Sequence, residues 1–155
     1  MEKLNINIKK LVSNAKIPKY AKPGDAGMDI TSVTKSVETD PHGSKTITYG
    51  TGLAFEIPEG YVGLLFPRSS VYKQGQRLTN SVGVVDSSYR GEIMFKYRQD
   101  VDVRLKDAYH SPFEYDVGER VGQIVIMPYP QVEFNEVDEL SDTDRGEGGF
   151  GSTGK

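Results

Sequence analysis

Short runs in which apolar and polar residues alternate recur along most of the chain, and they leave little choice of fold class. A period of two residues predicts a strand with one buried face, because successive side chains of a strand point to opposite sides. Turn signals containing Gly or Pro, such as PHG, IPEG and PYP, separate the runs. This pattern predicts an all-β jelly roll, sandwich or barrel. The runs begin with Leu4, Ile6 and Ile8 and continue at residues 45–49, 53–57, 61–66, 82–85, 93–97, 101–105, 123–127 and 132–134.

Helical periodicity is weak, and the one short helix that we expect covers residues 69–74. With 155 residues the chain suits one buried core rather than two, so we expect a single β domain over residues 1–134. Residues 135–155 differ in composition, with an acidic spacer followed by the glycine-rich RGEGGFGSTGK. Ordering such a segment costs much entropy, and we therefore expect a flexible C-terminal arm that becomes ordered against a ligand or partner.

The composition restricts the chemistry that the chain can perform. It has no Cys and only two His, which argues against thiolate metal sites and Cys or Ser-His nucleophiles and favours a carboxylate as any catalytic base. A net charge of -3 gives no basic surface for nucleic acid. No apolar run is long enough to cross a membrane, and the N-terminus lacks a signal-peptide core. We expect a soluble cytoplasmic protein with neither nucleic-acid nor membrane partners.

Residues 78–95, LTNSVGVVDSSYRGEIMF, place one acidic residue directly after an apolar run. We interpret residues 82–85 as a strand, the following residues as a turn, and residues 93–95 as the start of a returning strand. The expected structure is a β-hairpin with Asp86 near its tip. Such a position suits a catalytic carboxylate, although an Asp that only hydrogen-bonds its own turn would give the same pattern.

A second polar stretch, PRSSVYKQG at residues 67–75, combines an Arg with two Ser at the expected helix start. Arg68 can donate two parallel hydrogen bonds, and Ser69 and Ser70 can add neutral donors, which together would bind an anion. A helix cap beside a surface Arg explains the same residues. The role of Asp29 also has two interpretations: it could orient a metal-bound water, or it could be an ordinary turn residue.

Five motifs give the chain a resemblance to the trimeric deoxyuridine triphosphate nucleotidohydrolases, the dUTPases. They occur in the family's order and extend over nearly the whole chain. The last of them is a full match to the family pattern RGxGGFGSTG. The motifs are AGMDI at 26–30, PRSS at 67–70, NSVGVVDSSYRGEI at 80–93, GERVGQIVIMP at 118–128 and RGEGGFGSTG at 145–154.

The resemblance implies a distorted jelly-roll subunit of a homotrimer, with active sites between subunits and the arm closing over one of them. It implies hydrolysis of dUTP to dUMP and pyrophosphate, in which Asp86 activates the water that attacks the α-phosphorus. Tyr89 matches the aromatic residue that lies against the deoxyribose. Mg²⁺ is the implied cofactor, held mainly by the triphosphate, with Asp29 supporting it through water. The other positions that match substrate-binding residues are Arg68, Ser69, Ser70, Asn80, Gly83, Val84, Val85, Met94, Gln123, Arg145, Phe150, Gly151 and Ser152.

The chain departs from the family pattern in its long connection over residues 94–117, whose role the sequence does not explain, and in Gly122, which replaces a common Ala. Two other functions stay open at this stage. One is a dCTP deaminase of the same fold group, against which the arm with Phe150 argues. The other is a binding protein that responds to dUTP and signals to a partner, which would retain all five motifs.

Overall fold

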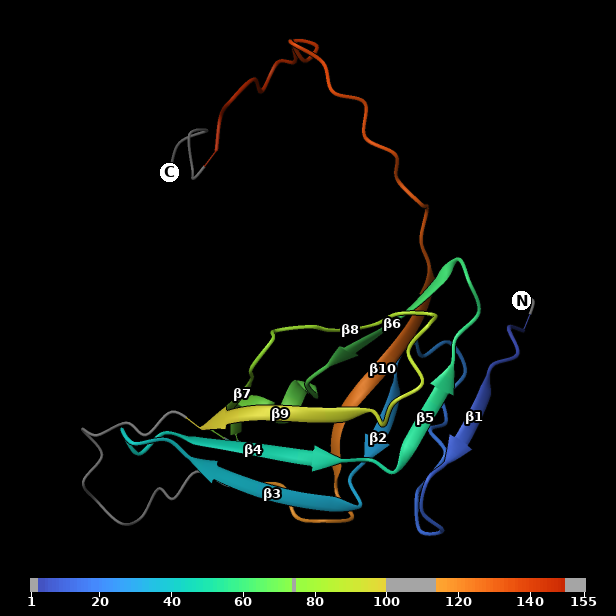
Figure 1. The fold of residues 1–155 in the computed structure, drawn as a ribbon, viewed down its shortest axis with the longest axis vertical. Coiled ribbons are helices and arrows are strands. Elements are labelled where there is room, and N and C mark those ends of the chain that lie inside the picture. The colour runs from blue at the N-terminus through green and yellow to red at the C-terminus, as the bar shows by residue number, and fades with distance from the viewer. Residues whose placement is uncertain (1–2, 74, 100–113, 150–155) are drawn as a thin grey trace.

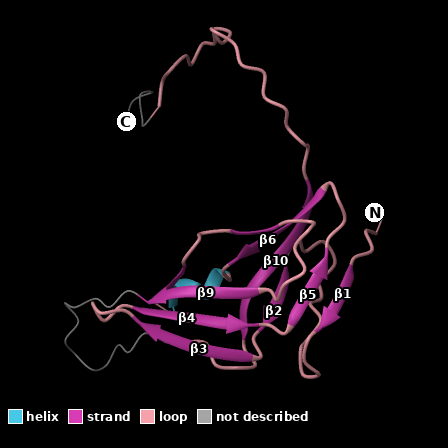
Figure 2. Ribbon diagram, in the orientation of Figure 1, coloured by secondary structure: helices cyan, strands magenta, loops and turns pink. Residues whose placement is uncertain are grey.

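A computed structural model describes residues 3–73, 75–99 and 114–149, and Figures 1 and 2 show its arrangement of strands. Ten strands lie in the described part of the chain, together with one 3-10 helix, η1, at Ser69–Lys73. The strands are β1 (Asn7–Lys10), β2 (Met28–Thr31), β3 (Thr34–Thr39), β4 (Lys45–Gly50), β5 (Leu53–Glu56), β6 (Tyr61–Phe66), β7 (Gln76–Leu78), β8 (Gly83–Val85), β9 (Met94–Gln99) and β10 (Arg120–Pro128).

Two four-stranded antiparallel sheets form the body of the fold. Sheet I has the order β2-β10-β6-β8, and sheet II has the order β3-β4-β9-β7. Strands β1 and β5 pair separately, and Figure 1 shows this pair beside the two sheets. Apart from β3 and β4, which form a local hairpin, neighbours in both sheets are distant in sequence, so the two layers form together. This is the all-β, jelly-roll-like architecture that the alternating pattern predicts.

The core lies between the sheets, where each strand turns its apolar residues inward. Strand β9 shows the alternation plainly: Phe95 and Tyr97 are fully buried, whereas Met94 and Lys96 are exposed. The ring of Phe95 packs against Gly122 of β10, where a Cβ atom would lie 2.1 Å from ring atom Cε1. Sheet II therefore approaches sheet I closely because residue 122 has no side chain.

Three tyrosines form an edge-to-face cluster at one end of the core. The ring centroids of Tyr49, Tyr97 and Tyr115 are 5.8 to 6.0 Å apart. Tyr97 donates a hydrogen bond of 2.7 Å to the carbonyl oxygen of Val121, which joins the two sheets. Burial raises the pKa of all three phenols, that of Tyr49 to about 12. These groups are therefore neutral at physiological pH, as a buried polar cluster without a full counter-charge requires.

Most strands predicted from the alternation are confirmed, with shifts of a few residues at their ends. The short helix is also confirmed, as a 3-10 helix. The strand predicted at residues 132–134 is wrong: this segment has no strand partner, and Phe134 is 93% exposed. Strands β2, β3 and β7 were not predicted, because β2 and β7 have only four and three residues and β3 is mostly polar. The run at 101–105 lies outside the described residues.

The predicted β-hairpin over residues 78–95 is also wrong. Strand β8 pairs with β6 in sheet I, whereas β9 pairs with β4 and β7 in sheet II. The polar turn between β8 and β9 therefore crosses from one sheet to the other. Periodicity identifies strands but not their partners, and here the two segments bury their apolar residues against opposite sides of the core.

The chain leaves sheet I at Pro128 and continues without regular secondary structure over the described residues 129–149 (Figure 1). Phe134 and Leu140 are 93% and 88% exposed in this single chain. The division into a domain at 1–134 and an arm at 135–155 stays a prediction. In the described part of the chain, no helix has the length and apolar character that a membrane span needs.

Candidate active site

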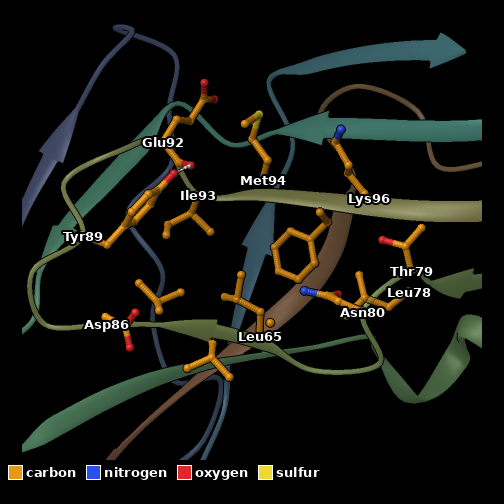
Figure 3. Close-up of a pocket in the computed structure, with 14 residues that line it drawn as sticks. Leu65, Leu78, Thr79, Asn80, Asp86, Tyr89, Glu92, Ile93, Met94 and Lys96 are labelled. Carbon is orange, nitrogen blue, oxygen red and sulfur yellow. Dashed lines mark hydrogen bonds between the residues drawn. The ribbon is translucent and has the colours of Figure 1, made fainter.

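A pocket of about 320 Å³ opens where the edges of the two sheets meet (Figure 3). Its walls come from β6 and β8 of sheet I, from β7 and β9 of sheet II, and from the turn that joins β8 to β9. The volume is within the range of small-molecule sites. Seven of the residues predicted to bind or act on substrate line it: Asn80, Gly83, Val84, Val85, Asp86, Tyr89 and Met94.

Strand β8 forms one wall with its backbone. It is the last strand of sheet I and pairs only with β6 among the described strands, so its other edge keeps unpaired N–H and C=O groups. Val85 is buried and anchors the strand, whereas Val84 is 65% exposed. An edge of this kind can pair with a planar ligand that presents alternating donors and acceptors.

Asn80 also lines the pocket, from the turn between β7 and β8, and it is exposed in this single chain. It precedes Ser81, which has a φ of 60°, the only positive φ at a non-Gly residue in the described chain. Such a conformation costs on the order of 1 kcal/mol, and it often marks a functional position. Gly83 lets β8 lie close to β6, since a Cβ atom there would lie 3.0 Å from Cβ of Leu65, whereas Nδ2 of Asn80 would be in ordinary contact at 3.4 Å. The turn thus holds the Asn80 amide beside the β8 edge.

Asp86 and Tyr89 stand on the turn at the mouth of the pocket. Both are exposed in this single chain. The backbone N–H of Tyr89 donates to the carbonyl oxygen of Asp86 at 3.1 Å, which keeps the two residues together. The Tyr89 hydroxyl donates to the carbonyl oxygen of Glu92 at 3.1 Å, as Figure 3 shows. A carboxylate and an aromatic ring therefore border one opening.

A second group of predicted residues gathers on sheet I, around Asp29 of β2. Nε of Arg68 donates to its Oδ1 at 3.2 Å, and Arg120 donates to its Oδ2 at 2.8 Å. One carboxylate thus orients two guanidinium groups. A separate hollow of about 430 Å³ beside them is lined by three basic residues and one acid, namely Lys16, Arg68, Arg120 and Glu119. The excess of positive charge suits an anionic ligand.

Gln123 adjoins this group. It lies opposite Asp29 on one side and Phe66 on the other, in the middle of sheet I. Its side-chain amide donates to the carbonyl oxygen of Pro67 at 3.0 Å, and Gly27 leaves space for its other end. Ser69 and Ser70 begin η1 directly after Arg68. The predicted phosphate-binding residues are therefore neighbours, yet neither Arg68 nor Gln123 lines the pocket that holds Asp86.

The described residues contain no group of three or more His, Asp or Glu side chains placed to hold a metal ion. Both oxygens of Asp29 already accept hydrogen bonds from Arg side chains. The part of the chain that the structure describes therefore does not build a cage for Mg²⁺ by itself. This donor set fits a Mg²⁺ ion whose ligands are mostly phosphate oxygens and water, which is how this ion is often bound beside nucleotides.

The predicted arm residues are only partly described. Arg145 is exposed and donates to the carbonyl oxygen of Gly148 at 2.9 Å, within a local turn. Phe150, Gly151 and Ser152 lie outside the described residues. In this single chain no contact between Arg145 and either group of site residues is seen, and its role stays a prediction.

Sequence reasoning missed three polar residues of the pocket wall, which are Thr79, Glu92 and Lys96. Glu92 is half-buried, and its Oε1 accepts the backbone N–H of Gly52 at 2.7 Å. No local pattern signals this contact, because it joins residues 40 positions apart. Lys96 occupies an exposed position of β9, where a solvent-facing Lys is expected from the alternation alone.

Comparison with known proteins agrees with this geometry. A sequence model of the dUTPase family matches residues 13–154. A deoxyuridine 5'-triphosphate nucleotidohydrolase of Nautilia profundicola is 45% identical, over 98% of this chain and all of that protein. One of Alkaliphilus metalliredigens is 42% identical over 97% of both chains. Among solved structures, the dUTPase of Staphylococcus bacteriophage 80alpha with dUpNHpp aligns with a TM-score of 0.79 and 30% identity, covering 97% of this chain and 99% of that one.

The chain therefore belongs to the dUTPase family, as its five motifs predicted. The fold is the all-β, jelly-roll-like fold of these enzymes. More particularly, the protein is a dUTP diphosphatase, an enzyme of nucleotide metabolism that hydrolyses dUTP.

Proposed function

We propose that this enzyme converts dUTP to dUMP and pyrophosphate by attack of water on the α-phosphorus, with Asp86 as the base. The observation that carries the proposal is the pocket between the sheets, which has an unpaired backbone edge along one wall and an exposed carboxylate at its mouth. A carboxylate beside bound substrate can take a proton from water as the new P–O bond forms.

The pocket is suited to uracil. This base presents an acceptor at O4 and a donor at N3, and backbone groups of the β8 edge at Val84 and Val85 can complement both. Asn80 adds a side-chain amide from the turn before β8. A base with a different pattern, such as cytosine, would leave buried groups unpaired, which costs about 1 to 3 kcal/mol for each group. Met94 contributes apolar contact from the opposite wall.

The sugar follows at the mouth, against the ring of Tyr89. A ring packed on the deoxyribose leaves no room for a ribose 2'-hydroxyl. We assign discrimination against UTP to this contact, because Tyr89 and Asp86 share one turn and so keep sugar and reacting phosphate in a fixed relation.

The triphosphate is bound by the donors around Arg68, with Ser69, Ser70 and Gln123. The acidic chain offers no general positive field, so local donors must neutralise the phosphate charge. Mg²⁺ is the proposed cofactor, and when bound it supplies further neutralisation of the phosphate oxygens. Asp29 would support it through water, while its direct contacts hold Arg68 and Arg120.

The complete site is assembled from several subunits of a homotrimer. In one chain the uracil pocket and the Arg68 group belong to separate hollows with no lining residue in common. A neighbouring subunit that places its Arg68 group over the Asp86 turn would bring the two halves together. The arm of a subunit would then cover the site, with Arg145 on phosphate, Phe150 over uracil, and Gly151 and Ser152 completing the contact.

The substrate is tested by incubating the enzyme with each deoxynucleoside triphosphate and Mg²⁺, and identifying the products. We expect dUMP and pyrophosphate from dUTP alone. Ammonia released from dCTP would contradict the proposal and favour a deaminase. Omitting Mg²⁺ in the presence of a chelator should lower the rate of pyrophosphate release.

The role of Asp86 is tested with Asp86→Asn. Asn preserves size and polarity but is not a base, so dUTP binding should persist while turnover falls by about 10² to 10⁴. Binding is measured by calorimetry and turnover by pyrophosphate release. Glu59→Gln, at an exposed position that lines neither hollow, is the matched control. Turnover of Asp86→Asn close to that of the control would refute the assignment.

A further inference from the structure

We propose that Glu92 is a positioning residue for sugar selection: its carboxylate, bound to the backbone amide of Gly52, fixes the place of the Tyr89 ring at the mouth of the pocket. The inference rests on the sugar contact that the proposed function assigns to Tyr89. It adds the residue that holds this contact in place and explains why an acid lines the wall of a pocket for an uncharged base.

The anchor is a short hydrogen bond in a partly buried place. The N–H of Gly52, in the turn between β4 and β5, donates to Oε1 of Glu92 at 2.7 Å. Bonds to an ionised acceptor are stronger than bonds between neutral groups. The turn is shaped to receive the carboxylate, because a Cβ atom at Gly50 would lie only 2.9 Å from the same oxygen.

Two further bonds secure the residue that follows Glu92. The Thr51 hydroxyl donates to the carbonyl oxygen of Ile93 at 2.7 Å, and the N–H of Ile93 donates to the carbonyl oxygen of Leu53 at 2.8 Å. Ile93 is itself 2% exposed. The backbone at residues 92–93 is thereby fixed to the β4–β5 turn, which is part of the core and not of the substrate pocket.

Tyr89 is hydrogen-bonded to this fixed backbone. Its hydroxyl donates to the carbonyl oxygen of Glu92 at 3.1 Å, drawn as a dashed line in Figure 3. The ring lies against Gly91, where a Cβ atom would be 2.3 Å from the hydroxyl oxygen and 2.5 Å from Cζ. Tyr89 is 44% exposed, so little else restrains it in this chain. The place of the ring depends on residues 91 and 92.

The test compares the ratio of kcat/KM for dUTP to that for UTP in Glu92→Ala, Glu92→Gln and wild type. Glu92→Ala removes the acceptor for Gly52, and we expect the ratio to fall by about tenfold, since a small displacement of a positioning group is sufficient for such a loss. Gln keeps an acceptor oxygen at the same place, so Glu92→Gln should recover most of the ratio. Glu59→Ala, at an exposed turn position, is the matched control.

Tyr89→Phe keeps the ring but removes the hydroxyl that contacts Glu92. It alters no buried group, so it provides the test even where Glu92→Ala yields no folded enzyme. The ratio of kcat/KM for dUTP to that for UTP should fall a few fold in Tyr89→Phe. Adding Glu92→Ala to this variant should lower the ratio less than it does in the wild type, because both changes break the same series of contacts.

Each outcome bears on a particular step. Loss of activity on both nucleotides with an unchanged ratio in Glu92→Ala, or an unchanged ratio in Tyr89→Phe, would overturn the role of Glu92. If Tyr89→Ala lowers the ratio of kcat/KM for dUTP to that for UTP but Glu92→Ala does not, the positioning role of Glu92 is refuted. The proposed contact between Tyr89 and the sugar would remain. A ratio that survives Tyr89→Ala would overturn that sugar contact, and the inference with it.

Discussion

Replacing Gly122 by Ala would press a methyl group into the ring of Phe95. The added Cβ would lie 2.1, 2.5 and 2.6 Å from ring atoms Cε1, Cζ and Cδ1, far inside van der Waals contact. Phe95 is fully buried between the two sheets, and the open space beside its ring is the substrate pocket that it lines. The substitution is of interest because Ala is the common residue at this position in the motif GERVGQ.

The expected size of the effect follows from two opposing contributions. Overpacking of a well-filled core costs about 1 to 3 kcal/mol. Gly122 does not have a positive φ, so Ala can adopt its backbone conformation. Ala also lowers the conformational entropy of the unfolded chain, which stabilises the folded protein by about 0.4 to 1 kcal/mol. An overlap as close as 2.1 Å places the cost of overpacking in the upper part of its range, about 2 to 3 kcal/mol. The net loss is then about 1 to 2.6 kcal/mol, which for a chain of this length lowers Tm by roughly 2 to 10 °C.

The loss is measured by thermal unfolding at one fixed protein concentration, since assembly of subunits makes Tm depend on concentration. Gly149→Ala is the control, because nothing lies within 4 Å of a Cβ atom there. Phe95 also lines the pocket, so KM for dUTP should rise in Gly122→Ala as the ring shifts.

A second substitution separates the ring contact from other causes. Phe95→Leu removes ring atoms that the new methyl group would meet. The double variant Phe95→Leu/Gly122→Ala should therefore be about 1 kcal/mol more stable than the sum of the two single effects predicts. A Gly122→Ala enzyme as stable as the wild type, or strictly additive effects in the double variant, would refute the close approach of the two sheets at this point.

Three further results are expected. Deleting residues 145–155 should lower turnover at least about 100-fold while circular dichroism and size-exclusion profiles stay unchanged, because no described strand is removed; loss of the assembled species would contradict this. Asp29→Asn should raise KM for dUTP several-fold with a smaller change in kcat, since Arg68 loses its ionic partner; an unchanged KM would count against the orienting role. Burial raises the pKa of Tyr49 from 10.0 to about 12, so its contribution to stability is complete below pH 10 and is lost as pH rises from 10 to 12. Urea unfolding at pH 8 and pH 11 should show this loss, and Tyr49→Phe should reduce it; an equal loss in that variant would place the effect elsewhere.

The strands were predictable wherever one face is apolar and the other polar, as in β9. Strand β3 was not, because only one of its six residues is partly buried and the sequence TKSVET carries almost no alternation. Residues 132–134 misled for the opposite reason: VEF alternates, yet in the single chain it has neither strand partner nor core to face. Strand pairing could not be predicted from the sequence, since β8 and β9 are close in the chain but belong to different sheets.

The family motif keeps Asn80, Asp86 and Tyr89 on one short segment, and the structure brings all three to one pocket, while their roles stay predictions. The pairing of Arg120 with a neighbouring acid was foreseeable from its position at the start of a strand, and the acid is Asp29. The contact of Glu92 with Gly52 was not foreseeable, because it depends on how the turn after β4 approaches the crossover between the sheets.

The pocket takes its walls from two different sheets, and this has a thermodynamic consequence for the enzyme in the presence of substrate. A nucleotide held by the β8 edge on one side and by β9 on the other joins layers that are otherwise connected through the core. Its binding free energy then adds to the free energy of unfolding, by about 2.7 kcal/mol at a concentration 100 times the Kd. The cell's own nucleotide pool would thus set part of the stability of the protein that controls it.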